Sequence, residues 1–266
     1  MPALPPAPPL GGGSPVGSRG TAMTGGVRER VLGCPVDVVD MGAAVEALLD
    51  FVAQPRNPPA LVVTLNPEMV MHAQRDPEFA ALLEHAALLV PDGVGVVKAL
   101  RRRGHPVQQR VTGIDLIRAY APHAARLGHR IALCGAAPGV AARAAEELRA
   151  ETPGLQVVAS DSGDPGPAVA ERLRAARPDV VCAAYGHGAQ ERFLAEHLPT
   201  IGAAAGIGVG GALDVLAGRV RRAPGVIQAA GFEWAWRLAR EPRRLRRQAV
   251  LPLYWWRERR EVAGSR

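Results

Sequence analysis

The segment VPDGVGVV, residues 90–97, joins an apolar run to a glycine-rich turn and carries one carboxylate at the junction. The run from Ala86 to Val90 has the composition of a buried strand, and Pro91 ends it. After Asp92 and two glycines the pattern becomes helical. Local sequence therefore gives Asp92 two interpretations. It can be a helix N-cap, the commoner use of Asp before a helix, or a catalytic acid or base at a strand end.

Apolar runs and helical patterns alternate on both sides of this segment. This alternation predicts an α/β fold, Rossmann-like, with a mostly parallel sheet and helices on both faces. Ligands bind such sheets beyond the carboxyl ends of the strands. Glycine or polar residues suited to that role follow several apolar runs, at Thr64, Asn66, Asp92, Gly135, residues 186–191 and residues 208–214. Their placement gives the catalytic interpretation of Asp92 the same weight as the cap.

Composition divides the chain into three parts. Residues 1–26 are rich in Pro and Gly, which predicts disorder, and they lack the apolar core of a signal peptide. Residues 27–218 hold the alternating pattern and form the predicted α/β domain. Residues 219–266 contain 13 Arg, 4 Glu and all four Trp of the chain. They form a predicted basic, Trp-rich, helical and membrane-associating appendage at the C-terminus.

The appendage indicates a contact with an anionic partner. Its apolar residues recur at helical spacing among arginines, which is typical of helices that lie in a membrane interface. A helix packed on the sheet with a solvated Arg face gives the same pattern. No recognised motif supports nucleic acid as the partner. No apolar run approaches the roughly 20 residues needed to span a bilayer, and three widely spaced cysteines indicate buried, reduced thiols.

Other motifs are less informative. Residues 206–211, GIGVGG, satisfy the GxGxxG pattern. In dinucleotide-binding folds that pattern opens the first βαβ unit, and an acidic residue about 20 positions later ends the second strand. Here the pattern lies late in the alternating region. Glu233 has the required spacing from it, but Glu233 lies among Trp and Arg residues and does not follow an apolar strand. An NAD(P)-dependent oxidoreductase is therefore the less favoured alternative. No P-loop, no GxSxG pattern and no metal-binding Asp-x-Asp pattern is present. Of the histidines, only His187 falls in a predicted site loop.

Several motifs, in chain order, resemble the WecG/TagA/CpsF family of bacterial glycosyltransferases. They are residues 64–68 (TLNPE), 91–98 (PDGVGVVK), 110–116 (RVTGIDL), 135–139 (GAAPG), 190–191 (QE), 209–214 (VGGALD), 222–224 (RAP) and 233–242 (EWAWRLAREP). The resemblance extends over about residues 30–253. Two loops depart from it: Gly188 stands where the family usually has proline, and residues 160–164 (SDSGD) replace a usual glycine–aromatic pair. These departures bear on the donor more than on the reaction.

The resemblance implies an inverting, metal-independent glycosyltransferase that needs no cofactor. It would move a sugar, typically of the N-acetylmannosamine type, from a UDP donor to a polyprenyl-diphosphate-linked sugar in cell-surface polysaccharide or teichoic acid synthesis. The protein would be cytoplasmic and peripheral on the inner face of the cell membrane. Nucleic acid is not expected as a partner, and a homo-oligomer is possible. A non-catalytic protein that binds a sugar nucleotide or a lipid on the same scaffold is the alternative from another class.

The resemblance also implies residue roles. Asp92 would be the general base on the acceptor hydroxyl, because an inverting displacement needs one base correctly aimed. Cationic guanidinium groups would stabilise the nucleoside diphosphate leaving group without a metal. The predicted substrate-binding residues are Thr64 and Asn66 near the base, Arg110 and Gln190, Glu191, Gly135, and the tail arginines Arg237, Arg244 and Arg247. With this assignment the base becomes the favoured interpretation of Asp92.

Overall fold

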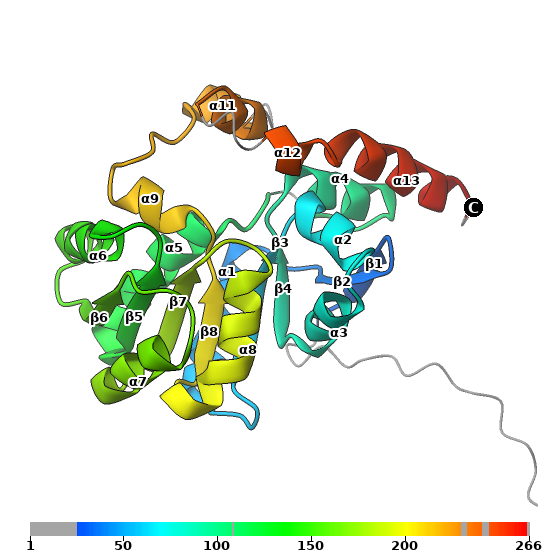
Figure 1. Cartoon of the computed structure of the whole chain (residues 1–266). Coiled ribbons are helices and arrows are strands. Elements are labelled where there is room, and N and C mark those ends of the chain that lie inside the picture. The colour runs from blue at the N-terminus through cyan, green and yellow to red at the C-terminus, as the bar shows by residue number, and fades with distance from the viewer. Residues whose placement is uncertain (1–25, 108, 230–232, 241–244, 265–266) are drawn as a thin grey trace, which may run out of the picture.

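A computed structural model describes residues 26–107, 109–229, 233–240 and 245–264 (Figure 1). The predicted disordered segment lies outside the described residues, except for Gly26. Six parallel strands form the central sheet in the order β4-β3-β8-β7-β5-β6. They are β3 (Ala60–Leu65), β4 (Leu88–Pro91), β5 (Arg130–Gly135), β6 (Gln156–Asp161), β7 (Val180–Ala184) and β8 (Ala205–Gly208). The predicted α/β class with a parallel sheet is confirmed.

Helices cover both faces of the sheet, as predicted. One apolar core packs the sheet against α1 (Met41–Ala53), α5 (Gly113–Leu127), α6 (Val140–Glu151) and α9 (Ala212–Leu216). The other packs it against α2 (Pro67–Ala73), α3 (Pro77–His85), α4 (Val94–Arg102), α7 (Pro167–Ala176) and α8 (Ala189–Ile201). Successive residues of each strand serve opposite cores, since Val62 lies in the first and Val63 in the second. The three cysteines are free and buried, as expected.

Local signals in the sequence set several helix starts. The Asp40 side chain accepts a hydrogen bond from the Ala43 N–H at the start of α1, and Thr112 accepts one from the Asp115 N–H at the start of α5. Before the sheet begins, the chain forms an antiparallel hairpin of β1 (Arg28–Val31) and β2 (Cys34–Asp37). Helix α8 continues through Pro199 to Ile201.

The C-terminal region consists of helices, and it runs along the edge of the sheet where the strands end (Figure 1). These helices are α10 (Gly225–Ala229), α11 (Glu233–Arg240), α12 (Leu245–Gln248) and α13 (Leu251–Gly264). The last of them contacts α2 and α4. Tyr254 and Glu258 of α13 are fully buried, and Glu258 pairs with both Arg102 and Arg103 at the end of α4. The tail is thus a packed part of the structure, and Trp256 on it remains 52% exposed.

Candidate active site

A cavity of about 400 Å³ lies at the carboxyl ends of β3, β4, β7 and β8, between the sheet edge and the C-terminal helices. Strand register explains why chemically useful residues gather there. Leu65 is paired with Pro91 across β3 and β4, so the next residues, Asn66 and Asp92, leave the sheet side by side. The backbone N–H of Asp92 donates to the Leu65 carbonyl at 3.0 Å. Five predicted residues line the cavity: Thr64, Asn66, Asp92, Arg110 and Gln190.

Asp92 is half-buried on the cavity wall, directly before α4. Gly93, not Asp92, occupies the N-cap position of that helix. The helix-cap interpretation is therefore wrong, and the carboxylate lies where a ligand in the cavity would meet it. The glycines after it have a packing role: a Cβ at Gly93 would lie 2.3 Å from Pro67 Cδ, and one at Gly95 would lie 2.6 Å from Pro67 Cγ. They allow the start of α4 to approach α2 closely.

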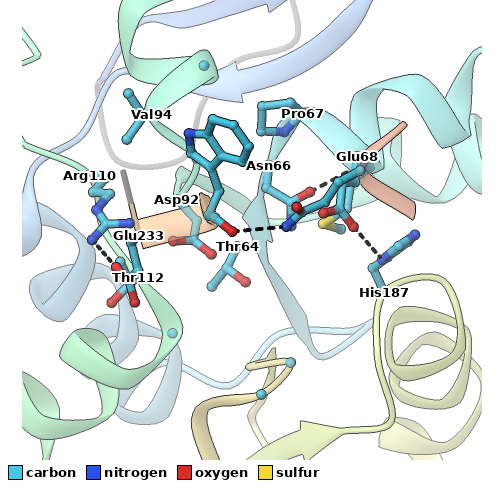
Figure 2. A pocket seen from close by; sticks show the side chains of 18 of the residues that line it. Thr64, Asn66, Pro67, Glu68, Asp92, Val94, Arg110, Thr112, His187 and Glu233 are labelled. Carbon is cyan, nitrogen blue, oxygen red and sulfur yellow. Dashed lines mark hydrogen bonds and ion pairs between the residues drawn. The ribbon is translucent and has the colours of Figure 1, made fainter. Parts of the chain in front are cut away.

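Thr64 and Asn66 are held in place by backbone groups. The Thr64 hydroxyl donates to the Gly208 carbonyl at 2.9 Å, which links β3 to β8 beneath the cavity. The Asn66 Oδ1 accepts from the Met69 N–H at 3.1 Å as the N-cap of α2. This interaction fixes the Asn66 carboxamide at the start of α2, and Figure 2 shows Thr64, Asn66 and Asp92 near one another in the cavity. Their side chains are thus preorganised next to the candidate base.

Gln190 reaches the cavity from the start of α8, and Glu191 stands behind it. The Gln190 Nε2 donates to Glu191 Oε1 at 2.7 Å, and the Gln190 Oε1 accepts from the Gly210 N–H at 3.0 Å. Glu191 is fully buried, accepts a second hydrogen bond from the Gly188 N–H at 2.6 Å, and does not line the cavity. Burial raises the pKa of the Glu191 carboxyl. Glu191 thus holds both the Gln190 side chain and the Gly188 backbone beside the cavity.

The GIGVGG motif has a structural explanation in the same region. It follows β8 at the centre of the sheet and does not open the first βαβ unit. A Cβ at Gly206 would lie 2.7 Å from Leu198, and one at Gly208 would lie 2.6 Å from Glu191 Oε1. The glycines therefore let α8 pack against β8 and leave space for the buried Gln190–Glu191 pair.

Arg110 faces the cavity from the side of β4 and pairs with Glu233, the first residue of α11. A second ion pair lies beside it, because Arg222 binds Asp115 with two hydrogen bonds of 2.6 and 2.5 Å. Burial acts to raise the pKa of Asp115, yet the hydrogen bonds from Arg222 and Thr112 hold it below its usual range. The Arg110–Glu233 pair, seen in Figure 2, joins α11 to the α/β body at the cavity wall, and the Arg222–Asp115 pair ties down the segment that precedes α10.

Sequence reasoning overlooked part of the cavity wall. Glu68 and Lys98 lie inside motifs that carried the family resemblance, so those motifs held a signal for them. Glu233 and Trp234 also lie inside such a motif, residues 233–242, whereas Trp255 was indicated only by the concentration of tryptophan in the C-terminal helices. In the part of the chain that the structure describes, no group of three or more His, Cys, Asp or Glu is placed to hold a metal ion.

Four other predicted substrate-binding residues are not among the described residues that line the cavity. Gly135 ends β5 but does not line the cavity. A Cβ there would lie 2.8 Å from the Ala184 carbonyl carbon, so this glycine permits close contact between β5 and β7. Arg244 lies outside the described residues, and the structure does not describe the side chains of Arg237 and Arg247. Their contact with a diphosphate stays a prediction.

Comparison with known proteins agrees with the motifs. Residues 29–266 match the model of the glycosyl transferase WecG/TagA/CpsF family. The chain belongs to this family. It is 34% identical over 201 residues to the N-acetylglucosaminyldiphosphoundecaprenol N-acetyl-beta-D-mannosaminyltransferase of Bacillus spizizenii, covering 75% of this chain and 78% of that one. The protein of the same description from Bacillus subtilis is 31% identical over 197 residues, with 73% and 77% covered.

Family membership confirms that the protein is a glycosyltransferase, a hexosyltransferase of cell-wall polysaccharide synthesis. The oxidoreductase alternative is wrong, in agreement with the packing role of the glycines in residues 206–211. Every helix within the described ranges falls short of the length and apolar character that crossing a bilayer requires.

Proposed function

We propose that this enzyme moves an N-acetylmannosamine-type sugar from a UDP donor to a polyprenyl-diphosphate-linked sugar, with inversion, without a metal, and with Asp92 as general base. The observation that supports this most is the position of Asp92 on the cavity wall, beside Thr64 and Asn66 and outside the N-cap of α4. The acceptor is inferred from the two Bacillus relatives, whose names specify N-acetylglucosaminyldiphosphoundecaprenol.

The proposed reaction is a single displacement. The acceptor hydroxyl oxygen attacks C1 of the donor sugar, and Asp92 takes the hydroxyl proton as the new C–O bond forms. The bond from C1 to the diphosphate oxygen breaks, and UDP leaves. A carboxylate suits this step because the base has only to lie within hydrogen-bond reach of the attacking hydroxyl. The nearby hydrogen-bonded Thr64 and Asn66 side chains orient the sugars, which lowers the entropic part of the barrier.

Arginine side chains are proposed to bind the negative charge that develops on the leaving diphosphate. Arg110 lines the cavity and already pairs with a carboxylate there. Guanidinium groups bind phosphate oxygens in a bidentate, charge-assisted manner. We assign the same role to Arg237, Arg244 and Arg247 from the family resemblance. Gln190, fixed by Glu191, would donate to the sugar or the diphosphate.

The enzyme is proposed to act as a peripheral protein at the inner face of the cell membrane, where a lipid-linked acceptor resides. The outer side of α13 exposes Trp256 together with Arg257, Arg259 and Arg260. The Arg260 guanidinium lies 4.1 Å from the centre of the Trp256 ring. Each such arginine near an anionic lipid surface contributes about 1 kcal/mol to binding. Trp at the interface adds an apolar anchor.

Lipid sedimentation tests the membrane contact. Changing the three exposed arginines of α13 to Gln should strongly reduce binding to phosphatidylglycerol vesicles and leave the weak binding to phosphatidylcholine vesicles unchanged. The matched control changes three exposed arginines on other helices, Arg126, Arg143 and Arg174, to Gln. Equal losses in both triple variants would show that net charge, and not α13, governs binding.

The transfer reaction itself is tested with the purified enzyme, UDP-N-acetylmannosamine and a short-chain prenyl-diphosphate N-acetylglucosamine. The wild-type protein should release UDP and form the lipid-linked disaccharide, and Asp92→Asn should lower the rate of both by about 100-fold or more while its melting temperature stays unchanged. Asp50→Asn, an exposed carboxylate on α1 outside the cavity, is the control and should remain active. The non-catalytic alternative predicts that UDP-sugar binds without UDP release.

A further inference from the structure

Two side chains face each other across one part of the cavity wall. Glu68 projects from the first turn of α2, and His187 projects from the loop between β7 and α8 (Figure 2). The His187 Nδ1 and Glu68 Oε2 atoms are 3.9 Å apart. That distance exceeds the 2.7–3.2 Å typical of a direct N–H···O hydrogen bond. It leaves room for one oxygen atom to lie within hydrogen-bond distance of both side chains.

The His187 ring packs against a second histidine ring. The His72 and His187 rings meet in a T-shaped arrangement, with ring centres 5.6 Å apart. The His72 ring is stacked on Phe79 at 4.5 Å, and its Nε2 lies 3.2 Å from Asp76 Oδ2. His187 therefore presents a supported ring to the cavity, as a binding residue requires.

Gly188 makes this arrangement possible, at the position where the family resemblance predicts proline. Its φ is +86°, whereas a proline ring fixes φ near −65°. A Cβ at Gly188 would also lie 3.0 Å from His72 Cε1. The replacement of proline and the contact between His72 and His187 therefore belong together as a local feature of this chain.

The two ends of the cavity offer different groups to a substrate. Arg110 lies beside β4, since the neighbouring Val111 N–H donates to the Pro91 carbonyl at 2.9 Å, and its guanidinium pairs with Glu233. His187 follows β7, three strands away in the sheet order. Figure 2 shows Asp92 and Thr64 between these two ends. A guanidinium group can bind phosphate oxygens, whereas the Glu68 carboxylate repels a diphosphate, so the Glu68 end suits an uncharged part of a substrate.

We propose that Glu68 and His187 together bind a hydroxyl group of one substrate pyranose and thereby select the sugar that the enzyme accepts. This inference rests on the proposed sugar transfer. A hydroxyl can accept a hydrogen bond from the imidazole N–H and donate one to the carboxylate at the same time. A site built to pair a substrate hydroxyl rejects an analogue that lacks it, because the analogue leaves buried polar groups unpaired. The pyranose belongs to either the donor or the acceptor.

Steady-state kinetics test the pair with Glu68→Gln, His187→Ala and the double variant. Either single change should raise the KM of one sugar substrate about tenfold or more, as expected for loss of a hydrogen bond to a charged group. The double variant should be little worse than the poorer single variant, because the two residues act as one unit. The substrate whose KM rises identifies the donor or the acceptor pyranose. Inhibition by UDP, which carries no pyranose, should stay unchanged.

Glu78→Gln and His85→Gln are the matched controls, since both residues are exposed on α3 and do not line the cavity. Unchanged KM values for both substrates in the Glu68 and His187 variants would overturn the inference. Weaker UDP inhibition in parallel would assign the pair to the nucleotide ribose and also overturn it. A wild-type protein without transfer activity would refute the proposed function instead. Calorimetry would then decide the inference, because unaltered binding of both sugar substrates to Glu68→Gln would exclude it.

Discussion

Replacing Gly93 by alanine should disturb the active site through one steric contact. The φ of Gly93 is −77°, which alanine adopts without strain, so backbone preference plays no part. The added Cβ would lie 2.3 Å from Pro67 Cδ and 3.2 Å from the Asn66 Cα. Carbon atoms pack at about 3.5–4.0 Å, so the start of α4 and the start of α2 have to separate by about 1 Å. The atoms in the way are a proline ring and a backbone carbon, and neither can rotate aside.

That displacement should lower both the melting temperature and the turnover rate. Overpacking of this kind costs about 1–3 kcal/mol, which for a chain of this size lowers the melting temperature by about 2–12 °C. The same shift moves Asp92 away from Asn66, and a misplacement of about 1 Å at a catalytic centre lowers the rate about 100-fold. Thermal unfolding followed by circular dichroism measures the first effect, and UDP release under saturating substrates measures the second.

Gly42→Ala is the control for this prediction, because its Cβ would make only an ordinary 3.5 Å contact with Asp40 Oδ1 in an exposed turn of α1. It should leave turnover unchanged and keep or slightly raise the melting temperature. Wild-type stability and turnover in Gly93→Ala would refute the steric argument. A lower melting temperature with normal turnover would refute the link between helix position and the base.

Three further predictions concern the carboxylates of the site and its surroundings. Asp92→Asn should lower kcat by about 100-fold or more while KM changes little, because the amide removes the proton acceptor and keeps the shape of the side chain. Steady-state rates at varied substrate concentrations measure kcat and KM separately. Asp115→Asn should lower the melting temperature at pH 7, because Asp115 binds Arg222. The folded-state pKa of Asp115 is depressed, so its stabilising effect is present above its ordinary pKa of about 4 and is lost as the pH falls through the folded value; melting curves of both proteins should therefore converge at low pH. Glu191→Gln should cost about 1–3 kcal/mol, because an amide cannot accept from both the Gly188 N–H and Gln190; urea unfolding at pH 7 measures the loss.

The sequence contained enough information for the architecture and the centre of the site. Caps at Asp40 and Thr112 and the alternation of apolar runs are local signals, and local geometry follows from them. The side-by-side placement of Asn66 and Asp92 was also foreseeable, because both follow strands of a parallel sheet. The local evidence for an Asp92 cap was misleading, since helix α4 begins one residue later than a capping Asp would require.

Other parts of the site depend on contacts between distant residues. Arg110 meets Glu233 across 123 positions of sequence, and no periodicity or motif encodes that pairing. The backbone at Gly188 depends on the His72 ring beneath it, which belongs to another helix. Tertiary packing decides both cases.

Helix α4 has a consequence for how truncations of this enzyme should be interpreted. Its start adjoins Asp92, Gly95 in its first turn would place a Cβ 2.9 Å from Tyr254 of α13, and its end binds Glu258 of the same helix. A protein cut before Tyr254 loses the neighbour that packs over α4, in addition to the tail arginines. Inactivity of such a fragment would mix two causes, a displaced base and missing cations. Tyr254→Ala in the full-length chain isolates the first cause, and charge-neutralising changes in the tail isolate the second.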